Sequence, residues 1–78
     1  MDTTKRKEMM QRQAVSSSSI ASIGYDPSSQ VIEVEFNDGA VYQYMNVPQI
    51  VFDGLITAGS HGTYLNAHIK GQYPYQRL

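Results

Sequence analysis

The sequence predicts a small α+β domain, in which a three-stranded antiparallel β-meander carries a main helix and a short second helix. Three observations predict this fold. Apolar and acidic residues alternate over Val31–Phe36, an Asp-Gly pair follows at Asp38 and Gly39, and apolar residues recur at helical spacing after Pro48. The 78 residues leave room for one domain, and without cysteine it must be stabilised by packing alone.

The three strands are expected at residues 20–25, 31–36 and 40–45. The first segment is rich in strand-forming side chains and ends at a turn that contains proline. The second alternates between an apolar and an acidic face, the pattern of a half-buried antiparallel strand. We expect its two acidic residues, Glu33 and Glu35, to be solvated and to keep that face of the sheet soluble.

The main helix is expected to begin at Pro48, because the first turn of a helix does not need the N–H that proline lacks. Apolar side chains over residues 47–58 form a broad helical stripe that can cover one face of the sheet. Gly54 weakens this helix by about 1 kcal/mol relative to alanine, so we expect it to permit close packing against the sheet. Ser60 is placed to cap a second helix that runs to Ile69.

The N-terminal segment, residues 1–15, is predicted to be a disordered, flexible basic arm that precedes a folded domain at residues 16–78. The net charge of −1 gives no global field that would attract nucleic acid, so any such binding must be local. The arm either contacts phosphate or an acidic protein surface, or is a solubilising tail. Its candidate contact residues are Lys5, Arg6, Lys7 and Arg12.

A second candidate set lies near the C-terminus, where aromatic, amide and basic side chains interleave as they do in single-stranded nucleic-acid sites. Its members are Tyr64, Asn66, His68, Lys70, Tyr73, Tyr75 and Arg77. A structural interpretation is equally compatible with the pattern. In it, two of the tyrosines fasten the C-terminal tail to the sheet edge, with or without a fourth strand, and Lys70 offsets the dipole at the helix end.

Tyr42 and Tyr44 share one face of the third strand. They are either core aromatics with hydroxyls at the rim or an exposed stacking platform. Because the chain has two Phe and no Trp, the core needs large residues, and we expect at least one of the two tyrosines to be buried.

The sequence gives little support for catalysis or metal binding. His61 and His68 lack acidic or cysteine partners nearby in sequence, so a zinc site would be incomplete. The serines do not occur in a motif that would place one beside a histidine and an acid. We therefore expect no enzymatic activity, no cofactor and no metal.

The apolar runs are far shorter than the roughly 20 residues that span a bilayer, and the N-terminus lacks a secretory signal. We therefore expect a monomeric cytoplasmic protein, in a bacterial cell or an infected host, that does not bind membranes.

Four segments carry a family resemblance. They are SSSIASIGYDP at residues 17–27, VEFNDGAVYQY at residues 34–44, VP at residues 47–48 and HGTYLNAHIKGQYPY at residues 61–75. In this order they resemble the KTSC domain, a short bacterial and phage family named for its occurrence at the C-terminus of some lysyl-tRNA synthetases. The resemblance covers about residues 15–77, and Tyr42 and Tyr44 match the family's Tyr-x-Tyr signature. It implies no enzyme chemistry, and the link to a synthetase suggests RNA binding.

We therefore expect a noncatalytic binding domain associated with transcription or translation, whose partner is RNA or single-stranded nucleic acid. The alternative is a protein-binding module, such as a phage-type regulator that contacts a host machine like RNA polymerase. Salt dependence separates the two, because phosphate binding weakens steeply with salt and a tyrosine-based protein interface does not.

Overall fold

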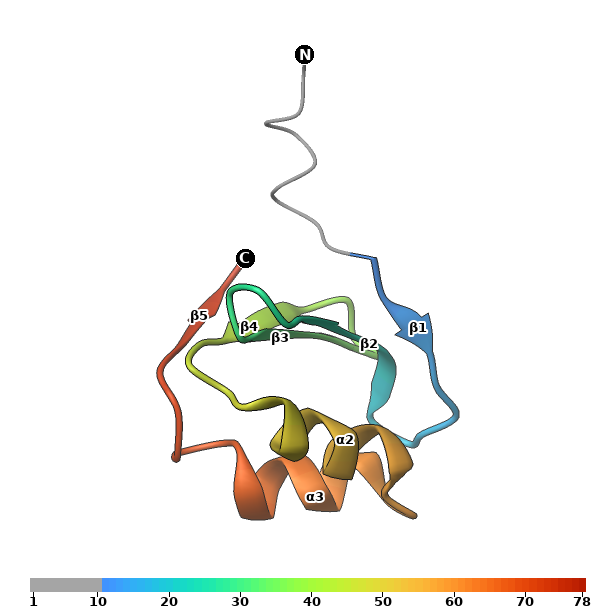
Figure 1. The fold of residues 1–78 in the computed structure, drawn as a ribbon. Coiled ribbons are helices and arrows are strands. Elements are labelled where there is room, and N and C mark those ends of the chain that lie inside the picture. Colours follow the sequence, from blue (N-terminus) through green and yellow to red (C-terminus); the bar gives the residue numbers. More distant parts are fainter. Residues whose placement is uncertain (1–10) are drawn as a thin grey trace.

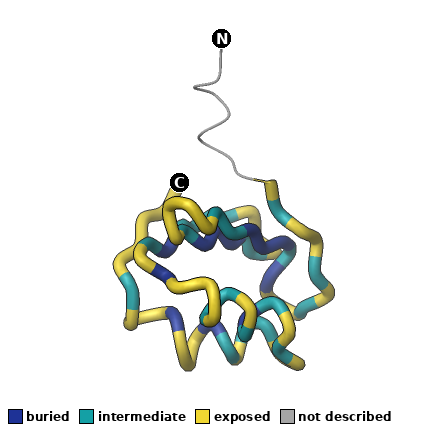
Figure 2. Tube along the Cα trace, viewed as in Figure 1, coloured by how far each residue is buried: buried dark blue, intermediate teal, exposed yellow. Residues whose placement is uncertain are grey.

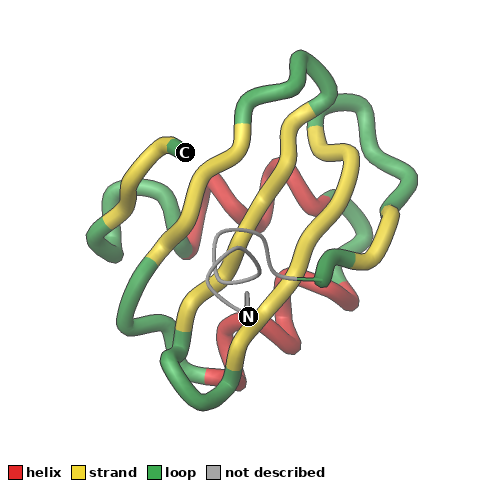
Figure 3. The backbone as a smooth tube through the Cα atoms, turned by 90° about the horizontal axis from the view of Figure 1, so that it is seen from above, coloured by secondary structure: helices red, strands yellow, loops and turns green. Residues whose placement is uncertain are grey.

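The structure is a computed structural model that describes residues 11–78. Across these residues the chain forms a five-stranded antiparallel sheet with two helices beneath one face (Figure 1). The strands are β1 (Gln13–Ala14), β2 (Ile20–Asp26), β3 (Val31–Phe36), β4 (Val41–Tyr44) and β5 (Tyr75–Arg77), and the helices are α2 (Gln49–Thr57) and α3 (His61–His68). The order of the strands in the sheet follows the chain, as Figure 3 shows from above.

The α+β class and the central meander of β2, β3 and β4 are as predicted, but the described residues form five strands rather than three. The two additional strands are short and lie at the edges. In β1, Gln13 and Ala14 pair with β2, and β5 pairs with β4 over three residues. Segments of two or three residues carry too little periodicity to be recognised from sequence, so their pairing is visible only in the folded chain.

Asp38 and Gly39 form the turn between β3 and β4, as the Asp-Gly pair predicts. The turn between β2 and β3 is held by the side chain of Asp26, which accepts hydrogen bonds from the backbone N–H of Ser28 and from the hydroxyls of Ser28 and Ser29. These bonds lower the pKa of the Asp26 carboxyl below its ordinary value, with the Ser28 hydroxyl as the largest cause.

Helix α3 begins where the sequence predicts, and α2 begins one residue later than predicted. Pro48 is the N-cap residue of α2, and Ser60 caps α3 by accepting a hydrogen bond from the backbone N–H of Thr63 at 3.3 Å. The expected role of Gly54 needs a correction, because its neighbour is the other helix and not the sheet. A Cβ atom on Gly54 would lie 2.6 Å from Cζ of Tyr64, so the glycine lets α3 pack closely against α2.

The core lies between the sheet and the helices (Figure 2). Its buried hydrophobic residues are Ile20, Ile23, Ile32, Val34, Tyr44, Val47, Leu55, Leu65 and Ile69. Tyr44 is 2% exposed, which confirms that at least one residue of the Tyr-x-Tyr pair is buried. Tyr25 joins β2 to the start of α2, since its hydroxyl donates to the carbonyl oxygen of Val47 at 2.6 Å and its ring stacks on Phe52 at a centroid distance of 4.8 Å.

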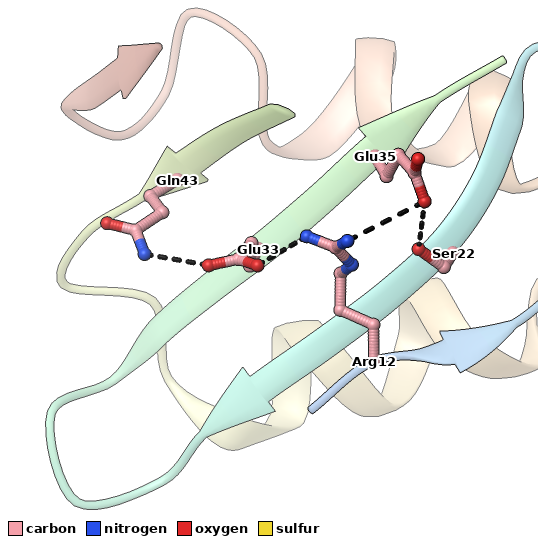
Figure 4. Close-up of polar contacts among 5 residues, drawn as sticks. All are labelled: Arg12, Ser22, Glu33, Glu35 and Gln43. Carbon is pink, nitrogen blue, oxygen red and sulfur yellow. Dashed lines mark hydrogen bonds and ion pairs between the residues drawn. The ribbon is translucent and has the colours of Figure 1, made fainter. Parts of the chain in front are cut away.

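The opposite face of the sheet is polar, and here the expectation of a solvated acidic pair is wrong for Glu33. The side chain of Glu33 is 0% exposed. Nη1 of Arg12 lies 2.5 Å from its Oε2, and Nε2 of Gln43 donates to its Oε1 at 2.8 Å (Figure 4). Arg12, which the sequence assigns to the arm, thus forms an ion pair with a buried carboxylate. The other three candidate arm contacts, Lys5, Arg6 and Lys7, lie outside the described residues.

Gly24 allows this ion pair to form. A Cβ atom on Gly24 would lie 2.6 Å from the carbonyl oxygen of Gln11 and 3.0 Å from Cγ of Arg12. The glycine therefore lets the chain before β1 pass directly over β2, and Arg12 reaches across to Glu33 on β3.

Neither α2 nor α3, the helices of residues 11–78, is long and apolar enough to cross a membrane.

Candidate functional site

A cleft of about 440 Å³ lies at the β4–β5 end of the sheet, beside the end of α3. We call it the aromatic cleft. Its lining residues come from β3 and the turn after it, from β4, from the chain two residues beyond the end of α3, and from β5. They are Phe36, Asp38, Ala40, Tyr42, Tyr44, Lys70, Tyr75 and Arg77.

The strand register explains why these side chains converge. Tyr42 pairs with Arg77 and Tyr44 pairs with Tyr75, and paired residues in an antiparallel sheet point to the same face. Tyr44 also pairs with the buried Ile32, so all four side chains lie on the face that the helices cover. Backbone hydrogen bonds at both ends of β5, from Met45 N–H to the Pro74 oxygen and from Leu78 N–H to the Val41 oxygen, extend the pairing with β4.

Tyr42 is the centre of the aromatic cluster. Its ring centroid lies 5.6 Å from that of Phe36 in an edge-to-face arrangement, 6.5 Å from that of Tyr44 and 5.8 Å from that of Tyr75. These separations are typical of interacting aromatic pairs. Tyr44 forms the buried floor, whereas Tyr75 is 61% exposed and presents its ring to solvent.

Burial raises the pKa of the Tyr44 hydroxyl above its ordinary value, and the neighbouring Tyr42 and Tyr75 raise it further. The floor of the cleft therefore stays uncharged at neutral pH.

Two cations border the aromatic rings. The guanidinium carbon of Arg77 lies 5.9 Å from the ring centroid of Tyr42, within the range of a cation–π contact. Lys70 is exposed and follows the fully buried Ile69, which fixes the backbone beside it. Within residues 11–78 the ion pairs are those of Arg12 with Glu33 and Glu35, so neither cation of the cleft has a carboxylate partner there.

Comparison with known proteins agrees with the sequence motifs. The family model of the KTSC domain matches residues 16–73. The chain belongs to the KTSC domain family. A crystal structure of a KTSC domain protein from Yersinia pestis has a TM-score of 0.84 and 41% identity, and the match covers 90% of this chain and 99% of that one. The resemblance drawn from the sequence is thereby confirmed.

Two further relatives place the KTSC domain in different contexts. An uncharacterized protein of Stutzerimonas stutzeri is 47% identical over 70 residues, which are 88% of this chain and 99% of that protein. A lysine–tRNA ligase of a Nostoc species is 41% identical over 54 residues, which are 69% of this chain and 10% of the ligase. The chain thus spans nearly all of the first relative and about a tenth of the second.

The structure brings three residues of the C-terminal candidate set into the cleft of this KTSC domain and leaves four outside it. Lys70, Tyr75 and Arg77 line the cleft. Tyr64 packs instead beside Gly54 of α2, and its ring centroid lies 4.4 Å from that of His68. Asn66 is exposed on α3, and Tyr73 packs, partly buried, against the core. Helical spacing places Tyr64 and His68, four residues apart, together on one side of α3.

The cleft of the KTSC domain also contains residues that the candidate set omitted. Phe36, Asp38 and Ala40 were not singled out, and the two tyrosines of the signature were considered mainly for the core. A signal was present in the sequence, because these five lining residues occupy every second position from 36 to 44. Their meeting with residues 70–77 depends on the pairing of β4 with β5, which the sequence alone does not give.

The two histidines have separate roles in packing. Nδ1 of His61 lies 2.9 Å from the carbonyl oxygen of Leu55, and because a carbonyl oxygen can only accept, this nitrogen carries the proton. His68 packs on Tyr64. Residues 11–78 of the KTSC domain contain no group of three or more His, Cys, Asp or Glu side chains arranged to hold a metal ion.

Proposed function

We propose that this KTSC domain is a noncatalytic binding module for single-stranded nucleic acid, RNA foremost, and that the aromatic cleft is its binding site. The observation that carries the proposal is the exposed Tyr75 ring beside Tyr42, bordered by Lys70 and Arg77 without carboxylate partners in the described chain.

The residues of the cleft supply the two interactions that single strands require. Stacking of one base on an aromatic ring contributes about 1–3 kcal/mol, and every base has a face that can stack. Tyr75 is exposed enough to receive a base, and the buried Tyr44 beneath it, at a centroid distance of 5.9 Å, supports the position of its ring. Lys70 and Arg77 then contact phosphate, Lys70 as a point charge and Arg77 with its planar guanidinium.

The relatives support RNA as the partner. A segment of lysine–tRNA ligases resembles this chain, and the name of those enzymes includes an RNA. In the ligases, a binding domain of this kind would add RNA contacts to a larger protein. In the Stutzerimonas stutzeri relative, it would act as a separate protein.

An NMR titration of the isotope-labelled chain with short RNA and single-stranded DNA, at low and high salt, tests the proposal. We expect salt-sensitive shifts of backbone amides over residues 36–44 and 70–78. Tyr75→Ala should weaken binding about tenfold through lost stacking. The control is Gln76→Ala, which changes the neighbouring exposed residue of β5 on the opposite face of the strand and should leave affinity unchanged. Absence of shifts at both salt concentrations, or equal affinities of the two variants, would contradict the proposal.

A second candidate function is binding of a protein segment at β5. This strand ends the sheet formed by the described residues, and its three residues are exposed. The unpaired backbone groups of an edge strand can accept an extended peptide as an added strand. If the titration with nucleic acid gives no shifts, capture of proteins with the wild-type chain and with an Arg77→Pro variant, which removes a backbone N–H that points away from β4, tests this candidate. Equal capture by both chains would exclude it.

A further inference from the structure

The aromatic cleft contains an acidic residue beside its two cations, although a site for phosphate would be expected to exclude negative charge. Asp38 lies in the turn between β3 and β4 and lines the cleft together with Ala40 and Tyr42. Its Oδ1 accepts a hydrogen bond from the backbone N–H of Ala40 at 3.0 Å. This bond holds the carboxylate in place, and within residues 11–78 its Oδ2 has no hydrogen-bond partner from the protein.

The strand register orders the charged residues along the cleft. Arg77 stands beside Tyr42 on the neighbouring strand, and Lys70 follows α3, whereas Asp38 precedes Tyr42 along the chain. A phosphate is attracted to the two cations and repelled by the carboxylate. Arg77 lies between the exposed Tyr75 ring and Asp38, so a phosphate bound by Arg77 can join a base stacked on Tyr75 to a next base near Asp38.

Ala40 leaves room for this arrangement. Positions 40 and 42 lie about 7 Å apart along the strand, and the alanine methyl is the smallest side chain between the Tyr42 ring and the Asp38 carboxylate. The nucleotide next to the one stacked on Tyr75 can extend over Ala40 and present the edge of its base to the free oxygen of Asp38. The volume of about 440 Å³ is within the range of small-ligand sites and suits a nucleotide and not a duplex.

We propose that Asp38 selects bases that carry an exocyclic amino group, so that the cleft prefers cytosine, adenine and guanine to uracil. This inference rests on the proposed function. A carboxylate oxygen accepts from the N4 amino group of cytosine or the N6 amino group of adenine. The donor of uracil, its N3–H, is flanked by two carbonyl oxygens that repel a carboxylate.

The test compares the affinities of hexacytidylate and hexauridylate by fluorescence anisotropy. Both are pyrimidine strands of equal charge, so their difference reports the base edge and not phosphate contacts. We expect the wild-type chain to bind hexacytidylate about tenfold more tightly, the scale of one good contact to a base edge.

The Asp38→Asn variant is designed to preserve the turn and reverse the hydrogen-bonding code. The asparagine Oδ1 still accepts from Ala40, and the second atom becomes an amino donor that suits the carbonyl oxygens of uracil. The affinity of this variant for hexauridylate should be higher than that of the wild-type chain. Its affinity for hexacytidylate should fall relative to its affinity for hexauridylate. The matched control is Asp53→Asn, which makes the same charge change at an exposed position of α2 outside the cleft and should leave the ratio unchanged.

The outcomes separate this inference from the function on which it rests. Equal affinities of the wild-type chain for the two strands, or an Asp38→Asn variant that strengthens both by the same factor, would overturn base selection while leaving the binding site in place. If the chain binds neither strand, or if Tyr75→Ala does not weaken binding, the proposed function and this inference are overturned together.

Discussion

Arg12 and Arg77 lie on opposite faces of the same sheet and differ in how their charges are balanced. The Arg12 side chain contacts Glu33, and side-chain hydrogen bonds continue from there through Gln43 to Gln76 on β5. Arg77 is exposed and lies over the Tyr42 ring, without an acidic partner in the described chain. A charge paired with a buried carboxylate cannot be removed alone without leaving that carboxylate unpaired, whereas a charge without a partner remains available for a ligand.

Removing each arginine in turn gives the largest expected difference between the two faces. Arg12→Met leaves the Glu33 carboxylate buried without its ion pair, which costs about 3–5 kcal/mol. Arg77→Met changes an exposed residue and should alter the free energy of unfolding by less than about 0.5 kcal/mol. Urea denaturation followed by circular dichroism measures both.

The double variant Arg12→Met/Glu33→Leu separates loss of the ion pair from loss of packing. Because it also removes the buried charge, it should recover most of the stability that Arg12→Met loses. If Arg12→Met proved as stable as Arg77→Met, the contrast between the two arginines would be lost.

The approach of the chain before β1 to β2 gives the next largest effect. Gly24→Ala places a Cβ atom 2.6 Å from a backbone oxygen, so the chain at residues 11–12 must move and Arg12 with it. We expect a loss of about 1–3 kcal/mol, the usual cost of overpacking. Native-state hydrogen exchange should show weaker protection of the Val15 amide, which donates to the Ala21 oxygen. Gly59→Ala, where a Cβ atom meets nothing within 4 Å, is the matched control.

Salt should affect the two faces differently. If Lys70 and Arg77 each neutralise one phosphate, the affinity for single-stranded RNA should fall about sevenfold between about 50 and 200 mM salt. The buried pair of Arg12 and Glu33 is screened much less, so stability should change little over the same range. Anisotropy titrations and urea denaturation at each salt concentration compare the two, and a double Lys70→Gln/Arg77→Gln variant should abolish the salt dependence of binding.

The smallest expected effect concerns the floor of the cleft at alkaline pH. Since burial raises the pKa of the folded Tyr44 hydroxyl above 10.0, the folded state holds this proton more tightly than the unfolded state. The corresponding stability is fully present below pH 10.0 and is lost as the pH rises through the folded pKa. Urea midpoints should therefore decrease at alkaline pH, and less steeply in Tyr44→Phe. The remaining decrease should come from Tyr25, whose pKa burial also raises; equal slopes for wild type and variant would exclude the Tyr44 contribution.

Local patterns in the sequence account for the central part of this fold. Alternation over residues 31–36, the Asp-Gly turn and the apolar stripe after Pro48 predicted β3, its hairpin and α2. Ser60 predicted the start of α3 through its hydroxyl. These features depend on neighbours within a few positions, so the residues concerned are adjacent in the sequence as well as in space.

The sequence by itself determined the meander, the two helix starts and three of the residues that meet in the cleft. Only the tertiary structure decided which polar groups are buried and which are available. Alternation placed Glu33 on the outer face, but its burial depends on Arg12, 21 positions earlier in the chain. The cleft likewise forms only when β5 pairs with β4, which brings Gln76 to Gln43 across 33 positions. Such contacts leave no local periodicity, because they are selected by the packing of the whole domain.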